Sequence, residues 1–378
     1  MRRSPNIMHG LLLWLCLSLA LPGLARAQPA PVRHTVGPLS GPSAVALTPI
    51  TGQHPQRPPF AQPPAVASSS TEAYTASVYL PLTVRPFPVD LSSKQDSLRF
   101  YREQYLPAEG VSIAWTGNYS QCAPGTTDAD FRSAVVRRVN YFRAMAGVPN
   151  DIVLTEEYNR KAQAAALMMS VNGTLSHYPT ADWLCYSADG ADGALHSNLA
   201  LFSRGPLTID AYIKDIGASN AAMGHRRWIL YPSTREMGVA EVPEQNDYWG
   251  SNALWVVDTY YYYPRPHTRH VFVAWPPPGY VPYPVVYARW SLSYPNADFS
   301  EATVTMLHAG HAVSLVLEPV RNSPGDNTIV WVPFDMSSTQ TWSRPQGDTA
   351  YTVMVGNVLV DGIAQDFNYD VVVFDPDP

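Results

Sequence analysis

The sequence predicts an α+β protein in which a region of mixed helices and strands precedes an all-β sandwich. Apolar residues recur at helical spacing in two stretches between residues 127 and 171. After residue 285 the pattern changes to short β-rich runs separated by turn residues, with no helical period between them. A proline-rich stretch lies between the two regions, with seven prolines from Pro264 to Pro284. These three observations predict two folded regions joined by a junction.

The first 27 residues have the features of a cleaved secretion signal. Two arginines precede an eleven-residue apolar run at 11–21, and residues 25–27 read Ala-Arg-Ala, which is typical of a cleavage site. A membrane-spanning helix needs about 20 apolar residues, and a Pro-Gly pair ends this run early. We therefore expect a secreted or extracytoplasmic chain that is cut after Ala27 and has no transmembrane segment in its mature part.

The low content of charged residues and the negative net charge limit the partners that the protein can bind. Charged residues are 15% of the chain, against about 25% in a typical soluble protein, and the formal net charge is −6. Nucleic-acid binding needs clustered Lys and Arg, so we expect no nucleic-acid partner. A polybasic membrane anchor is excluded on the same ground.

The cysteine count indicates one disulfide. The chain has three cysteines, and Cys16 leaves with the signal. In an oxidising compartment the remaining Cys122 and Cys185 most simply pair with each other. The alternative is two free thiols, which are less common outside the cytoplasm.

The elements follow in order. Residues 28–90 are rich in Pro, Ala, Ser and Thr and predict a disordered tether. Helices are expected at 127–146, where Asp128 is the candidate cap and Gly147 ends the run, at 155–171 and at 208–216. Residues 176–205 are expected to be rich in loops, and strands are expected at 237–242 and 252–258. The C-terminal strands are expected at 287–293, 302–306, 313–317, 328–332, 351–355 and 369–374.

The predicted boundaries are a signal peptide at 1–27, a tether at 28–90, a first domain at 91–260, a Pro/Tyr-rich junction at 261–284 and a β-sandwich at 285–378.

Three short motifs in the middle region together resemble a known protein family. Leu175-Ser-His177 comes first, His196-Ser-Asn-Leu199 follows, and Gly224-His225-Arg-Arg-Trp comes last. In this order, after an Asn-Tyr-Phe-Arg helix and an Ala-rich helix, they resemble the bacterial branch of the CAP superfamily. This superfamily, also called the SCP domain, comprises cysteine-rich secretory, antigen 5 and pathogenesis-related proteins. The resemblance covers about residues 128–258.

The resemblance implies an α-β-α sandwich with a cleft lined by two histidines and two acids. His177 matches the first histidine, His225 the second, and Asp215 falls where the family usually has glutamate. The other acid normally belongs to a Gly-Glu-Asn-Leu box. Here Ser197 replaces that acid, before Asn198, so the family's set of four residues is incomplete.

These residues also allow a metal site. The imidazoles of His177 and His225 are suitable ligands for Zn²⁺ or another divalent cation, and His196 could be a third ligand if its loop turns inward. Asp215 could then accept a histidine N–H and fix its tautomer. The alternative is that the histidines are structural, with His196 on a surface loop. Ser197 lacks the Gly-x-Ser-x-Gly context of a nucleophile, and no His-Glu-x-x-His motif is present.

The leading hypothesis is a secreted CAP-domain binding protein rather than an enzyme. Its ligand would be a lipid, a small molecule, an envelope component or a partner protein, held in the cleft with or without a metal. A metal-assisted hydrolase that uses the two cleft histidines is one alternative. A structural envelope protein with a degenerate cleft is another. The neighbouring pair Arg226 and Arg227 is expected to pin a loop through backbone carbonyls rather than to clamp an anion.

Overall fold

The computed structural model describes residues 88–202, 205–322, 325–337 and 339–377. The predicted signal peptide and nearly all of the predicted tether lie outside these residues. The described residues belong to one compact unit. None of their helices is both long enough and apolar enough to cross a membrane.

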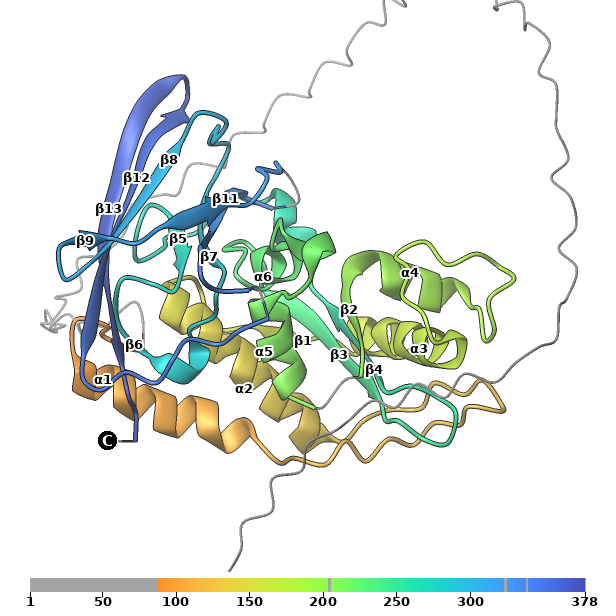
Figure 1. Ribbon diagram of the computed structural model, residues 1–378. Coiled ribbons are helices and arrows are strands. Elements are labelled where there is room, and N and C mark those ends of the chain that lie inside the picture. The colour runs from red at the N-terminus through yellow and green to blue at the C-terminus, as the bar shows by residue number, and fades with distance from the viewer. Residues whose placement is uncertain (1–87, 203–204, 323–324, 338, 378) are drawn as a thin grey trace, which may run out of the picture. The chain divides into compact units, whose positions relative to one another are not determined.

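The first half is a three-layer α-β-α arrangement, as the resemblance implied (Figure 1). Its sheet has the strand order β1-β3-β4-β2, in which β1 runs parallel to β3 and the other pairs are antiparallel. Helices α3 and α4 cover one face of the sheet, and α2 and α5 lie on the other. The strands are β1 (Val153–Leu154), β2 (Ser197–Leu201), β3 (Glu236–Val242) and β4 (Ser251–Trp255).

The two long helices begin at side-chain caps, and the sequence indicates both ends of the first. The Asp128 side chain accepts a hydrogen bond from the Asp130 backbone N–H at the start of α2 (Ala129–Ala146), and Gly147 ends the helix in the left-handed conformation. Thr155 caps α3 (Glu156–Asn172) in the same way. The remaining helices are α1 (Lys94–Phe100), α4 (Ala188–His196), α5 (Leu207–Lys214) and α6 (Gly224–Ile229).

The prediction of a loop-rich stretch at 176–205 is wrong in its second half. Both α4 and β2 lie there. Helix α4 contains two glycines, which oppose a helix assignment from sequence. Gly193 lies against α3 so closely that a Cβ would be 2.2 Å from the Lys161 carbonyl oxygen. Close packing of the two helices therefore selects glycine at a position where helix propensity disfavours it.

The second half is the β-sandwich that the sequence predicts. One sheet has the order β10-β11-β7-β5 and the other the order β6-β13-β12-β8-β9. Three tryptophans, Trp275, Trp290 and Trp331, are fully buried in its core. The strands are β5 (Val273–Trp275), β6 (Gly279–Pro282), β7 (Trp290–Tyr294), β8 (Thr303–His308), β9 (His311–Ala312), β10 (Leu315–Leu317), β11 (Asn327–Pro333), β12 (Thr349–Val360) and β13 (Ile363–Phe374).

The Pro/Tyr-rich stretch 261–284 contributes one strand to each sheet of the sandwich. Strand β5 pairs with β7, and β6 pairs in parallel with β13. Proline is tolerated here because both strands are short and lie at sheet edges. The domain boundaries given above stay a prediction.

Candidate functional site

A cavity of about 380 Å³ opens where the end of α4, the start of β2 and the start of α6 meet. His177, His196 and His225 all line it, as do Ser197 and Asn198. Five of the predicted site residues, from three distant parts of the sequence, therefore surround one space. Apolar side chains complete the lining: Leu195, Trp228, Val256 and Val257.

Asp215 lies behind His225 and fixes its orientation. It ends α5 in the left-handed conformation, at φ +52°, and its side chain is fully buried. One carboxylate oxygen accepts from His225 Nδ1 at 2.7 Å, and the other accepts from the His225 backbone N–H at 3.1 Å. Because the carboxylate accepts, the imidazole proton belongs on Nδ1, and Nε2 keeps its lone pair.

His177 is oriented in the same sense by a backbone carbonyl. Its Nδ1 lies 2.8 Å from the carbonyl oxygen of Ala194, near the end of α4. A carbonyl can only accept, so Nδ1 donates and Nε2 is again the nitrogen with a free lone pair. The cavity is therefore lined by two imidazoles in the tautomer suited to accept a hydrogen bond or to bind a cation.

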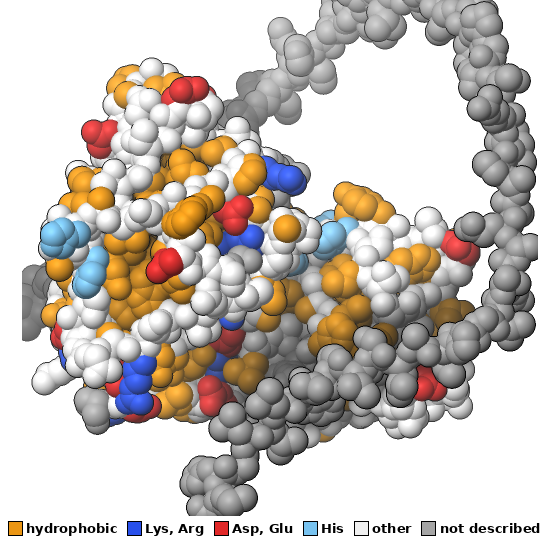
Figure 2. Space-filling view, in the orientation of Figure 1, with side chains coloured by type: hydrophobic (Ala, Val, Ile, Leu, Met, Phe, Trp, Pro, Cys, Tyr) orange, Lys and Arg blue, Asp and Glu red, His pale blue; other side chains and the backbone are white. Residues whose placement is uncertain are grey.

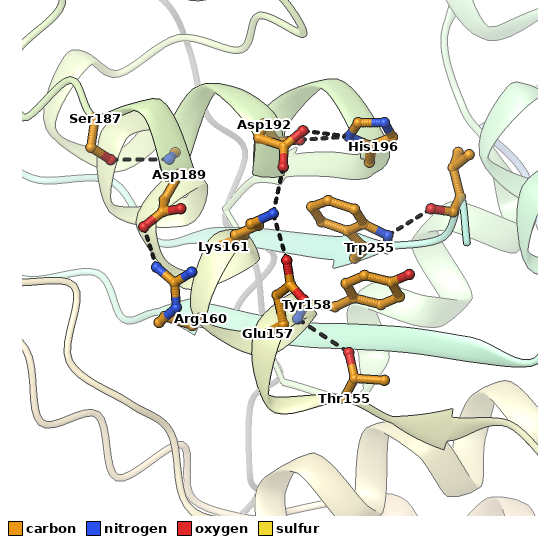
Figure 3. Close-up of polar contacts among 12 residues, drawn as sticks. Thr155, Glu157, Tyr158, Arg160, Lys161, Ser187, Asp189, Asp192, His196 and Trp255 are labelled. Atoms are coloured by element: carbon orange, nitrogen blue, oxygen red, sulfur yellow. Dashed lines mark hydrogen bonds and ion pairs between the residues drawn. The ribbon is translucent and has the colours of Figure 1, made fainter. Parts of the chain in front are cut away.

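His196 is the last residue of α4 and is held by a stack of rings (Figure 3). Its ring packs on Trp255 at 4.6 Å between centroids, and Tyr158 packs on the other face of Trp255 at 4.5 Å. Its Nδ1 lies 2.9 Å from the Asp192 carbonyl oxygen and 3.0 Å from the Asp192 carboxylate. Lys161 joins Asp192 to Glu157 at 2.8 Å from each. This network, which the sequence did not reveal, fixes His196 at the wall of the cavity.

Ser197 and Asn198 occupy successive positions of β2, so their side chains point to opposite faces of the sheet. The Asn198 amide donates to the His225 carbonyl oxygen at 3.1 Å and thereby ties β2 to α6. Ser197 pairs in register with Trp255, and its buried hydroxyl has no hydrogen-bond partner among the described residues. The position that carries an acid in the family is thus occupied by a small neutral group that does not hydrogen-bond to either cavity histidine.

The donor set limits which metal could fit. Within the described part of the chain, no three His, Cys, Asp or Glu side chains are grouped closely enough to hold one metal ion. The imidazoles of His177, His196 and His225 are the nitrogen donors that line the cavity, and the three are not grouped closely enough to hold one ion together. A bound divalent ion would therefore take its remaining ligands from solvent or from the ligand itself.

Arginines fasten the segment that carries Asp215 and His225. Arg226 is buried and donates from Nε to the Ile213 carbonyl and from Nη1 to the Arg289 carbonyl, and burial lowers its pKa to about 9. Arg227 donates to backbone carbonyls of residues 321 and 326. Both side chains pin loops through carbonyls, as the sequence suggested.

The β-sandwich contributes Arg289 to the site, a residue that sequence reasoning missed. Its Nη1 donates to the Asp215 carbonyl at 2.5 Å, and its Nη2 donates to the Gly217 carbonyl at 2.9 Å. Arg289 precedes β7 directly, so the sandwich positions the residue that orients His225. No sequence pattern marks this role, because an arginine next to a strand is ordinarily solvated.

Residues 136–260 match the family model of the cysteine-rich secretory protein family, CAP. This stretch of the chain is a CAP domain. The match begins inside α2, ends at residue 260 and includes His177, Asp215 and His225. A search of curated proteins found no match. The family match supports a CAP-domain protein of a general ligand-binding type.

The predicted disulfide is confirmed. Cys122 and Cys185 are bonded, with their Cα atoms 5.1 Å apart. The bond ties the segment before α2 to the loop between His177 and α4. It therefore restrains the loop that connects His177, at the cavity, to α4. CAP domains are typically extracellular, and a disulfide suits that environment.

Proposed function

We propose that this protein is secreted and binds a small amphiphilic ligand in the CAP-domain cavity. His177 and His225 would hold the polar end of the ligand, either directly or through a divalent cation. The observation that carries the proposal is the convergence of the two imidazoles on one cavity, each with Nδ1 held by an acceptor.

The lining of the cavity suggests the chemistry of the ligand. The oriented imidazoles offer acceptor nitrogens, which suit a hydroxyl, an amide N–H or a metal-bound group. Leu195, Trp228, Val256 and Val257 offer an apolar wall. A volume of about 380 Å³ is at the lower end of the range for small-molecule sites, which is about 300–1,000 Å³. A small molecule or one end of a lipid therefore suits the cavity better than a large polymer.

The test uses the mature chain and two probes, a fluorescent long-chain alcohol, whose hydroxyl can donate to an imidazole Nε2, and Zn²⁺ alone. His177→Phe and His225→Phe are expected to weaken binding of the alcohol at least about tenfold, because one good hydrogen bond to a polar group is worth about 1.5 kcal/mol. The matched control is His267→Phe, at an exposed histidine elsewhere in the chain. Binding of both probes by the two cavity variants at the wild-type level would contradict the proposal.

One observation favours the alternative of a metal-assisted hydrolase. The Asp215–His225 hydrogen bond is the type of carboxylate–histidine pair that orients metal ligands and general bases. Under this alternative, purified protein would contain metal and hydrolyse ester or amide substrates, and His225→Ala would abolish both. Protein that binds the long-chain alcohol after chelation, without any turnover, would favour the binding function.

A further inference from the structure

The hairpin between β8 and β9 places two histidines opposite each other. Ala309 and Gly310 form its two-residue loop, with φ values of +49° and +78°. Positive φ at both loop positions is the signature of a type I′ turn, which joins strands of an antiparallel hairpin without splaying them. The residues on either side of the turn, His308 and His311, are therefore direct cross-strand partners.

This pairing places both imidazoles on one face of the hairpin. Directly opposite residues of an antiparallel pair project from the same face, with Cβ atoms about 4.5–5.5 Å apart. Histidine nitrogens bind Zn²⁺ at about 2.0–2.1 Å, a distance that two neighbouring rings on one face can satisfy together. Both residues are exposed, and Figure 2 shows histidine side chains at the surface beside β9.

Neighbouring groups orient one of the two rings. The Nδ1 of His308 donates to the Ala350 carbonyl oxygen at 3.2 Å, and the ring packs against Tyr351 at 5.0 Å between centroids. A backbone carbonyl on Nδ1 leaves Nε2 as the lone-pair nitrogen, which is the usual arrangement of a metal-binding histidine. The His311 side chain makes no hydrogen bond to the described residues, so its ring can turn toward the same ion.

We propose that His308 and His311 form a surface site for a divalent transition-metal ion. The pair supplies two nitrogen ligands, and water supplies the others. Imidazole ligands favour Cu²⁺ over Ni²⁺ and Zn²⁺ by the general order of affinities. The site lies on the β-sandwich and shares no residue with the CAP-domain cavity, so it is independent of the function proposed above.

The experiment titrates the mature chain with Cu²⁺ and records both calorimetry and electron paramagnetic resonance. His308→Gln and His311→Gln are each expected to lower the Cu²⁺ affinity at least about tenfold, since even the outer partners of a metal ligand are worth that much. The wild-type spectrum should show two coordinating imidazole nitrogens. In a His177→Gln background, which breaks the imidazole pair of the cavity, the double variant should lose that signature. It should keep its circular-dichroism spectrum, because both residues are exposed.

Two control variants separate this site from other histidines. His267→Gln tests a single exposed histidine, and His177→Gln tests the cavity. Both are expected to keep the two-nitrogen Cu²⁺ signal. The proposal is overturned if the double variant in the His177→Gln background binds Cu²⁺ with the affinity and spectrum of His177→Gln alone, or if His177→Gln by itself removes the signal.

Discussion

The two halves of the molecule fill their interiors with different chemistry. Among the largest fully buried side chains, the CAP half holds Arg138, Arg143 and Arg226, whereas the sandwich holds three tryptophans. The difference follows from the backbone. Paired strands satisfy their own N–H and C=O groups, so the interior of the sandwich needs fewer hydrogen-bond donors from side chains. The CAP half contains loops whose backbone carbonyl groups are buried, and these carbonyls need hydrogen-bond donors from side chains.

Arg143 shows this most clearly. From α2 it donates to the carbonyl oxygens of four residues in two loops, at distances of 2.6–2.9 Å. The acceptors are Pro149, Ile229, Tyr231 and Thr234. Three of them lie just after α6 or at its end, so this arginine fastens the segment that follows His225.

The largest expected effect is that of Arg143→Met. The apolar side chain leaves four carbonyls without donors, so the free energy of unfolding should fall by about 4 kcal/mol in urea titrations. The matched control is Arg137→Met, an exposed position of the same helix, where we expect a change within about 0.5 kcal/mol. Equal effects of the two variants would show that the buried carbonyls do not depend on this donor.

The second expected effect is loss of the disulfide. Replacing both Cys122 and Cys185 by Ser should destabilise the CAP half by about 2–4 kcal/mol, because the bond closes a long loop with a sequence separation of 63. Hydrogen exchange of the two halves is the measurement. Amides near the cavity should lose protection while those of β12 and β13 keep theirs. Uniform loss across both halves would instead show that the halves unfold as one unit.

The smallest expected effect is a pH dependence from His270, beside the sandwich. Burial, with a contribution from Arg269, lowers the pKa of His270 below its ordinary value of 6.5. The unfolded chain therefore takes up this proton first as the pH falls below 6.5, so stability should decrease on acidification and recover as the pH rises. His270→Asn should flatten this part of the profile of melting temperature against pH. A wild-type profile that rises on acidification, and an unchanged slope in the variant, would contradict the assignment.

Short sequence signals predicted the helix ends that depend only on neighbouring residues. Asp128 and Gly147 mark the two ends of α2 because capping depends on residues within one turn. Helix α4 escaped detection because Gly193 serves a contact with α3, which is distant in sequence. Among the site residues, the motifs located both cavity histidines and Asp215. They did not show the stack of His196 on Trp255 or the role of Arg289.

The sequence by itself determined the α+β class, the CAP domain, the cysteine pair and the residues that would meet at a cavity. These depend on periodicity, on short motifs and on the count of reactive groups. The tertiary structure decided how those residues are held: Asp215 and Ala194 set the tautomers of the two histidines. It also decided that Arg289, the residue before β7 of the sandwich, positions Asp215. The physical reason is that hydrogen bonds between side chains and distant carbonyls depend on packing, and a linear pattern carries no record of which chain segments are packed together.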